Sequence, residues 1–209
     1  MRNLSALSFF LAGLTLVLGP ALAQGGLAVS THQADITGNT FSTAACFPDD
    51  TGLLDASAEA ADTGGDGDGF ETTPANAFAD AGGSASNTDG AADQHRFYNY
   101  GISVSGSCSI TGIAVRLDWW LDDTAGISSM DAELSWDGGT TWATAKTDTV
   151  ESTTEHSATL GGSSDTWGRT WAVSELSNAN FRVRVTSNSD DALRDFFLDW
   201  VPVQVYYGP

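Results

Sequence analysis

Basic residues are scarce in this chain. Eight lysines and arginines stand against 27 aspartates and glutamates in 209 residues. Nucleic-acid binding needs basic side chains that displace counterions from phosphates, and anionic membrane surfaces also attract basic segments. The charge balance therefore argues against nucleic acid and against a membrane surface as partners. It is typical of a protein that stays soluble in an extracellular medium.

Residue types that often carry catalysis are few and scattered. The three histidines, His32, His95 and His156, share no spacing of a zinc site, and the chain has no G-x-S-x-G motif. Aspartate and glutamate are numerous, but the sequence alone does not select two of them as a glycosidase pair. We therefore expect no enzyme and rank a hydrolase last among the candidate functions.

Long apolar runs are confined to the N-terminus. An apolar run from Leu4 to Leu18 follows Arg2, and an A-x-A cleavage site precedes Gln24. This order predicts a secretory signal peptide over residues 1–23, because a membrane anchor would need roughly 20 apolar residues. Without Arg2 the mature chain carries 7 basic and 27 acidic residues, a net charge of −20. We expect a secreted or cell-surface protein that does not insert into a membrane after signal removal.

Cysteine occurs only twice, as Cys46 and Cys108. In an exported chain the two are expected to form one disulfide, which would tie an N-terminal segment to the region after Val104. Two buried thiols, or pairing between chains, are the alternatives.

Alternating apolar residues dominate the second half of the chain. Runs such as Ile113, Val115, Leu117, Trp119 and Leu121 occupy every second position. The strands expected on this pattern are 98–104, 113–122, 130–136, 181–186 and 194–207. Short alternating runs separated by Gly and Asp clusters predict an all-β fold, a two-sheet antiparallel β-sandwich of jelly-roll type, over residues 48–209.

Other segments depart from this alternation. Pro202 cannot donate to a strand ladder, so a register change is expected between Asp199 and Pro202. In the Gly-rich region before the clear strands, Leu53–Ala61 is predicted as a short helix and Phe70–Ala79 as a strand. The segment 167–176 is predicted as a loop and a helical turn, with Trp167 and Trp171 closing the end of the sandwich.

One short motif resembles a known element. The segment Ser135-Trp-Asp-Gly-Gly-Thr-Thr-Trp142 fits S-x-D-x-G-x-T-W and resembles the Asp box of sialidases and other β-proteins. That resemblance implies a hairpin in which Asp137 binds turn amides, Gly139 takes a positive φ and Trp142 packs beneath. Sialidases carry several copies around a propeller, whereas this chain has one and is too short for such a propeller. The motif, with Ser135, Asp137, Gly139 and Trp142, therefore predicts a hairpin and is silent on catalysis.

An acidic, glycine-rich segment precedes the strands. Its carboxylates are oxygen ligands of the kind that calcium takes, and the candidates are Asp62, Asp66, Asp68 and Glu71. The spacing is not that of an EF-hand, since no Glu stands at the twelfth position counted from Asp62 or Asp66. A solvated loop without metal is the alternative. No other cofactor is expected.

Trp120 falls on the polar face of its predicted strand, beside Arg116, Asp118 and Asp122. An exposed tryptophan often marks an interface or a platform for a sugar. The alternative is that another sheet, a loop or the N-terminal segment covers it.

Residues 24–47 are expected to form a polar, strand-like arm ahead of the sandwich. Within it, Ala34-Asp-Ile-Thr-Gly-Asn-Thr-Phe-Ser-Thr43 resembles the start of camelysin-type biofilm-matrix fibre subunits, and the likeness ends at Ala45-Cys46. Residues 70–207 are similar to modules of large bacterial surface proteins. The camelysin resemblance implies a jelly-roll sandwich that polymerises by donating its N-terminal strand to a neighbour. The side chains that would then fill the neighbour's groove are Leu27, Val29, Ile36 and Phe41.

The first hypothesis for function is therefore a structural subunit of an extracellular filament, a head-to-tail homopolymer assembled by strand donation. If the arm instead folds back as the first strand of its own sandwich, no filament follows. The alternative function is a secreted carbohydrate-binding β-sandwich module that binds extracellular polysaccharide.

Overall fold

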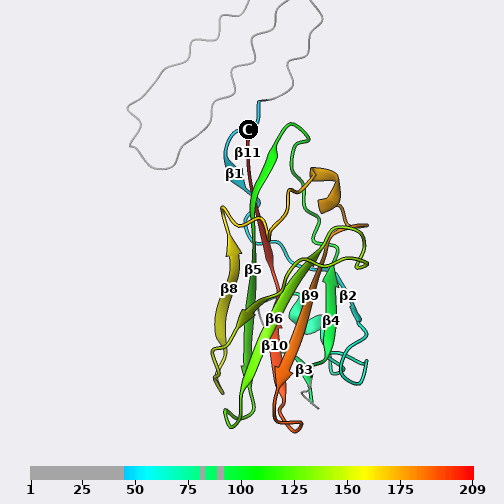
Figure 1. Cartoon of the computed structure of the whole chain (residues 1–209), viewed down its shortest axis with the longest axis vertical. Helices are drawn as coiled ribbons and strands as arrows, with labels where there is room; N and C mark the ends of the chain where they lie inside the picture. The colour runs from blue at the N-terminus through cyan, green and yellow to red at the C-terminus, as the bar shows by residue number, and fades with distance from the viewer. Residues whose placement is uncertain (1–44, 81–82, 89–91) are drawn as a thin grey trace, which may run out of the picture. The chain divides into compact units, whose positions relative to one another are not determined.

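Two antiparallel sheets pack face to face in the domain (Figure 1). The computed structural model describes residues 45–80, 83–88 and 92–209. Within them, the two helices are single 3-10 turns, η1 (Pro74–Ala77) and η2 (Val173–Leu176). No helix among these residues is long and apolar enough to span a membrane.

The first sheet has six strands built around the long strand β5 (Ser109–Leu121). On one edge β5 pairs with β8, and on the other it pairs with β10 and then with β11. The short strands β1 and β3 continue the sheet beyond β11 and β10. The bounds of these strands are β1 (Asp49–Asp50), β3 (Ala85–Asn87), β8 (His156–Gly162), β10 (Phe196–Trp200) and β11 (Val203–Gly208).

The second sheet has five strands in the order β2-β4-β9-β6-β7, and every pairing in it is antiparallel. Its strands are β2 (Ala58–Ala61), β4 (Gln94–Tyr98), β6 (Ser128–Ser135), β7 (Lys146–Asp148) and β9 (Arg182–Ser189). The predicted fold class, an all-β antiparallel sandwich of two sheets, is confirmed.

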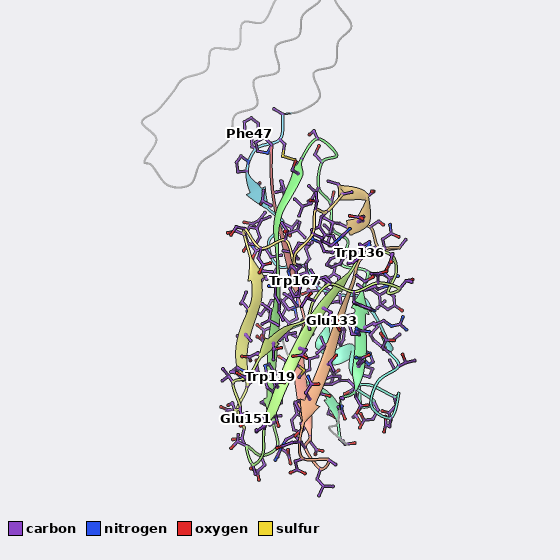
Figure 2. All side chains as sticks on the ribbon, viewed as in Figure 1. Phe47, Trp119, Glu133, Trp136, Glu151 and Trp167 are labelled. Carbon is purple, nitrogen blue, oxygen red and sulfur yellow. A yellow bond between two sulfur atoms is a disulfide. The ribbon has the colours of Figure 1, made fainter. Side chains whose placement is uncertain are left out.

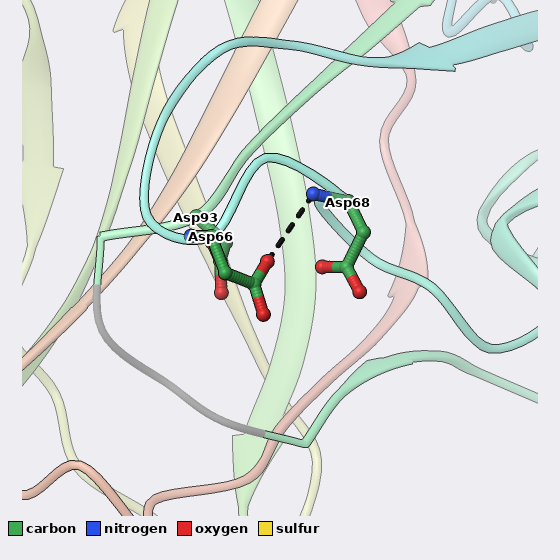
Figure 3. A group of neighbouring side chains, drawn as sticks. All are labelled: Asp66, Asp68 and Asp93. Atoms are coloured by element: carbon green, nitrogen blue, oxygen red, sulfur yellow. Dashed lines mark hydrogen bonds between the residues drawn. The ribbon is translucent and has the colours of Figure 1, made fainter.

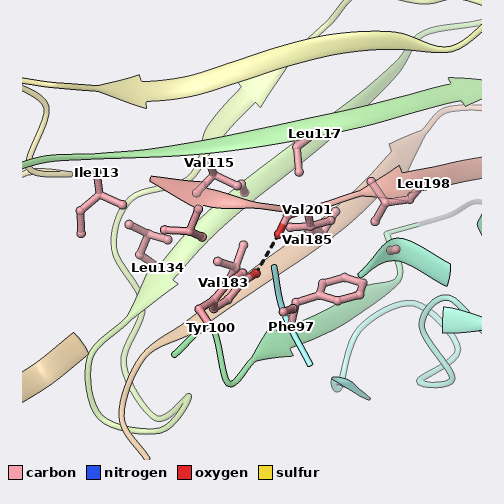
Figure 4. Close-up of a cluster of buried hydrophobic side chains, with 14 of the residues drawn as sticks. Phe97, Tyr100, Ile113, Val115, Leu117, Leu134, Val183, Val185, Leu198 and Val201 are labelled. Atoms are coloured by element: carbon pink, nitrogen blue, oxygen red, sulfur yellow. Dashed lines mark hydrogen bonds between the residues drawn. The ribbon is translucent and has the colours of Figure 1, made fainter. Parts of the chain in front are cut away.

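The core lies between the sheets, where alternate residues of each strand meet (Figure 4). The odd-numbered residues of β5 from Ile113 to Leu121 are all fully buried, as the alternation predicts. Val183 and Leu134 are among the residues that the second sheet contributes to the core from the opposite side. Tyr100 is also buried here, and its hydroxyl has a partner in the core, because it donates to the Val201 carbonyl at 3.1 Å.

The register change predicted near the C-terminus is present. The pairing of β10 with β5 shifts between Leu198 and Trp200, and the ladder resumes at Val203 in β11. Asp199 is the extra residue of this bulge. It shifts the alternation by one position, so that the apolar residues Val201, Val203 and Val205 point into the core. As a result Phe197 and Trp200 both point away from the core, whereas Val203 points into it.

Two expectations for the region before β4 are wrong. Leu53–Ala61 is not a helix: Leu54 bridges to Val203, and residues 58–61 form β2 against β4. The alanine-rich run has helical propensity, but pairing with β4 satisfies its backbone and overrides that propensity. Phe70–Ala79 is not a strand either, since it contributes two isolated bridges, at Thr72 and Phe78, with the turn η1 between them.

The predicted disulfide between Cys46 and Cys108 is present, and their Cα atoms are 5.2 Å apart. It joins the segment before β1 to the start of β5, the central strand of the first sheet. The bond therefore fixes the point at which the N-terminal segment meets the sandwich.

Candidate functional site

The outer face of the first sheet, turned away from the core, gathers aromatic and charged side chains. In the register of the sheet, Trp120 of β5 stands opposite Phe197 of β10, and Asp118 stands opposite Trp200. Arg116 lies two residues further along β5, on the same face. We call these five residues, Arg116, Asp118, Trp120, Phe197 and Trp200, the aromatic face.

Trp120 and Phe197 form a stacked pair. Their ring centroids are 5.3 Å apart and their planes differ by 15°. Both residues are half-buried. Part of the Trp120 side chain is therefore covered, and part of it remains accessible to solvent. Stacking covers one face of each ring and leaves the other face to different contacts.

Arg116 is held in a fixed orientation beside Trp200. Its Nε and one terminal nitrogen donate to the two carboxylate oxygens of Asp118 at 2.7 and 2.6 Å, and the Asp118 side chain is fully buried. The guanidinium also donates to the Ser157 hydroxyl at 2.9 Å and lies 4.8 Å from the centroid of the Trp200 ring. A two-point pair of this kind fixes the orientation of the guanidinium plane.

Trp200 is anchored at its polar end. Its indole Nε1 donates to the Asp55 carboxylate at 2.8 Å, and its backbone bridges to Phe78. The ring is therefore oriented before any ligand arrives, which lowers the entropy cost of binding.

The Asp-box segment forms a tight hairpin turn after β6. The Asp137 carboxylate accepts from the Thr140 and Thr141 amides at 3.0 and 2.8 Å and from the Ser135 hydroxyl at 2.9 Å. Gly139 has φ of 97°, and a Cβ placed there would come within 3.4 Å of the Trp142 ring. Asp137 and Gly139 thus lie in the turn itself, and Ser135, the last residue of β6, bridges to Trp142 across it. The motif belongs to the second sheet, whereas the aromatic face belongs to the first.

Asp137→Ala is expected to lower the free energy of unfolding by about 1–2 kcal/mol, because two turn amides lose their acceptor. Burial would raise the pKa of Asp137, but hydrogen bonds from Thr141, Ser135 and Thr140 outweigh it and hold the pKa below its usual value. The stabilisation is thus complete above the ordinary aspartate pKa and lost as the pH falls through the lowered value. Denaturant unfolding of Asp137→Ala at neutral and acidic pH measures both effects.

Asp137→Asn is the matched control for that experiment, since it keeps one acceptor oxygen but cannot ionise. It should lose less stability than Asp137→Ala at neutral pH. Equal stability of all three proteins would show that the turn does not depend on this side chain.

Of the four predicted calcium ligands, Asp66 and Asp68 lie in one acidic group (Figure 3). Asp66 and Asp68 converge with Asp93, a residue that the sequence did not single out, and each offers a carboxylate oxygen within 4.8 Å of the others. The Asp68 amide donates to Asp66 at 3.2 Å. A hydrogen bond with the Asp66 carboxylate is the largest cause that raises the pKa of Asp68, to about 6.

The other two predicted ligands are engaged elsewhere. A carboxylate oxygen of Asp62 lies 3.5 Å from the guanidinium of Arg184. Glu71 accepts a hydrogen bond of 3.0 Å from the Thr88 amide. Asp93 is buried and already accepts from the Asn87 amide and from the Asp66 backbone. Calcium binding by this loop stays a prediction.

The residues predicted to act in strand donation, Leu27, Val29, Ile36 and Phe41, lie outside the described residues, as does the signal peptide. Donation of the arm therefore stays a prediction.

Two tryptophans of the segment 167–176, Trp167 and Trp171, are buried and belong to the core; Figure 2 labels Trp167. The Trp167 indole donates to the Ile113 carbonyl at 2.9 Å. Beside Trp171 lies a pocket of about 630 Å³ lined by Cys108–Ile110 and Thr170–Ser174. No ionisable side chain lines it, so it offers no group for acid–base chemistry.

No protein-family model and no curated protein matches the chain. Among solved structures, the chain is similar to the CBM32 module of AlyQ in complex with 4,5-unsaturated mannuronic acid, with 16% identity and a TM-score of 0.39 over 72% of this chain and 96% of that one. It is also similar to a Family 16 Carbohydrate Binding Module-2, with 11% identity and a TM-score of 0.36 over 61% and 79% of the two chains. A third is TmCBM61 in complex with β-1,4-galactotriose, with 9% identity and a TM-score of 0.35 over 70% and 86%. Likenesses this distant assign neither a family nor a ligand, so function has to be argued from the residues of the site.

Proposed function

We propose that this protein is a secreted carbohydrate-binding β-sandwich module and that the aromatic face binds a neutral polysaccharide. The observation that carries the proposal is the stacked, half-buried pair of Trp120 and Phe197 on the same sheet face as Trp200, whose ring lies against the fixed guanidinium of Arg116.

The aromatic rings supply the apolar part of such a site. A pyranose ring presents C–H groups on its faces, and an aromatic side chain combines a flat apolar surface with few rotatable bonds. Trp120, Phe197 and Trp200 come from two adjacent strands of a rigid sheet rather than from loops. The spacing of the rings is therefore set before the sugar binds, which reduces the ordering cost.

The polar part of the site is suited to hydroxyl groups. Asp118 is fully buried and serves to orient Arg116, whereas Ser157 is exposed and its hydroxyl, which accepts from Arg116, keeps a donor position for a sugar. The ligand is expected to be neutral, because the chain as a whole is strongly acidic and would repel a polyanion.

Trp120→Ala is expected to weaken polysaccharide binding by about tenfold or more, since truncation of an aromatic anchor typically has an effect of that size. The measurement is native affinity electrophoresis of the full chain in gels that contain xylan, β-glucan or galactomannan, with alginate as the anionic comparison. The wild-type chain should be retarded by at least one neutral polysaccharide and not by alginate.

Phe47→Ala is the matched control. Phe47 is 61% exposed and lies towards the opposite end of the domain from Trp119, the neighbour of Trp120 (Figure 2). The Phe47→Ala variant should be retarded by the polysaccharide as strongly as the wild-type chain. Retardation that survives Trp120→Ala in a folded protein would place binding elsewhere, and no retardation by any neutral polysaccharide would contradict the proposal.

A further inference from the structure

One border of the first sheet is a long strand with a neighbour on one side only. Strand β8 pairs with β5 along seven consecutive residues without a register shift, and within the described chain it pairs with no other strand (Figure 1). The other edge strands of the two sheets, β1, β2, β3 and β7, have two to four residues each. Among the described strands, β8 therefore presents the longest open edge.

The backbone of β5 shows which residues of β8 point outward. In an antiparallel pair, alternate residues direct both of their backbone groups to one neighbour. The Ile113 amide donates at 3.0 Å to the Asp165 carbonyl, just beyond β8, whereas the Arg116 amide donates at 3.1 Å to Pro202, between β10 and β11. The odd-numbered residues of β5 therefore bond to β8, and the even-numbered ones bond to the strands on the other side.

Ser157 and Thr159 carry the outward backbone groups of this edge. They stand opposite Asp118 and Arg116, which are even-numbered residues of β5, so their amides and carbonyls point away from β5. Both residues are exposed, and outside the strand ladders no backbone–backbone hydrogen bond of the described chain involves either of them. A row of free donors and acceptors of this kind is a template for one more antiparallel strand.

Strand β8 also lacks the features that normally protect an edge from pairing. From His156 to Leu160 it has no proline, no bulge and no aspartate, glutamate, lysine or arginine. In contrast, β1, β2 and β7 each contain charged residues, and β3 has only three residues. The regular part of β8 ends at Gly161, whose φ is 85°.

We propose that two copies of this chain pair edge to edge through β8 around a two-fold axis. A strand and its own copy are antiparallel when such an axis stands perpendicular to the sheet. With Ala158 on the axis, Ser157 of each copy stands opposite Thr159 of the other, and the two residues exchange both backbone hydrogen bonds. Their side chains lie on the same face of the joined sheet, so the two hydroxyl groups meet as a cross-strand pair.

The charges along this edge permit contact between two copies of an acidic chain. In the proposed register Glu155 stands opposite Gly161 of the second copy, so the two Glu155 carboxylates do not face each other. Thr159 adjoins Arg116 of its own copy, and Ser157, which faces it from the second copy, adjoins Asp118. The axis therefore sets the arginine of each copy in line with the aspartate of the other. Charge complementarity of this kind favours a second copy as the occupant of the edge.

A contact around a two-fold axis closes at two copies, so the expected product is a dimer and not a filament. Sedimentation velocity of the full chain over about 1 μM to 1 mM covers the range of a weak to moderate contact. The wild-type chain should change from monomer to dimer within this range and form nothing larger. The measurement needs no polysaccharide, so its result is independent of the proposed function.

Thr159→Pro should remain a monomer at every concentration. Proline removes the outward amide of this edge position, and an edge strand tolerates that loss because the ladder to β5 does not use the amide. Thr159→Val is the matched control, since it keeps the backbone amide and a β-branched side chain. It should dimerise in the same concentration range as the wild-type chain.

Amide hydrogen exchange of the wild-type chain gives a second measurement that does not depend on folding of the proline variant. The Ser157 and Thr159 amides should exchange at least about tenfold more slowly in the concentrated sample than in the dilute one, because pairing protects them. A wild-type chain that stays monomeric throughout, or a folded Thr159→Pro variant that still dimerises, would overturn the proposal. Assembly beyond a dimer, or concentration-dependent protection at another edge strand and not at β8, would overturn it as well.

Discussion

Replacing Cys46 and Cys108 together by serine is expected to lower the free energy of unfolding by about 4 kcal/mol, which corresponds to a fall of about 10 °C in the unfolding midpoint. The disulfide spans 62 positions in the sequence, so it removes many conformations from the unfolded chain. It also fixes the segment before β1 to the start of β5. Without it, β1 is held by its two-residue pairing with β11, by the hydrogen bond from Gln204 to Asp50 and by the contacts of Thr51 with Val205.

Chemical denaturation under oxidising and reducing conditions measures this effect. Reduction of the wild-type chain should reproduce the loss, and the double serine variant should not respond to reductant. A double variant as stable as the oxidised wild-type chain would show that the bond is absent or that the segment before β1 contributes no stability.

Strands whose residues alternate strictly between core and solvent could be predicted from the sequence. In β5 the apolar residues Ile113 to Leu121 face the second sheet at every alternate position, and this period is visible without knowledge of partners. Edge strands could not be predicted in this way. In β8 no residue is fully buried, and half-buried positions alternate with exposed ones only from His156 to Leu160, so its period-two signal is short and weak even though it pairs with seven residues of β5.

The aromatic face could be predicted only in part, for a related reason. The outward direction of Trp120 follows from its position in β5, but the identity of its partner depends on the register between β5 and a strand more than 70 residues away. The bulge at Asp199 then decides which residues of β10 point outward. A one-residue bulge inverts the faces of everything that follows it, so local alternation could not place Trp200 beside Arg116.

The acidic groups show the same limit. Asp66 and Asp68 are close in sequence and remain close in the structure, whereas Asp93 joins them only through the start of β4. Asp62 is instead held near the guanidinium groups of Arg96 and Arg184, which no spacing in the sequence indicates. Charge density along the chain identified one candidate loop but not the group of Asp80, Asp118 and Glu155, whose carboxylates converge from three separate segments.

Adjacent tryptophans on β5 allow a direct test of the two faces of the first sheet. Trp119→Ala is expected to lower the free energy of unfolding by about 4 kcal/mol. Its side chain is fully buried against Phe196 and His156, with ring centroids 6.1 and 4.8 Å away. Its indole also donates to the Asp148 carboxylate at 2.9 Å, so truncation leaves both a cavity and a lost hydrogen bond.

Urea unfolding of Trp119→Ala, Trp119→Phe and Trp120→Ala measures the contrast. Trp119→Phe keeps most of the ring volume and should lose less than half as much stability as Trp119→Ala. Trp120→Ala should lose about 1 kcal/mol, because this side chain is half-buried and stacks on one neighbour only. An equal loss for Trp119→Ala and Trp120→Ala would mean that Trp120 is a core residue, and the outer face would then have no tryptophan at its centre to bind a sugar.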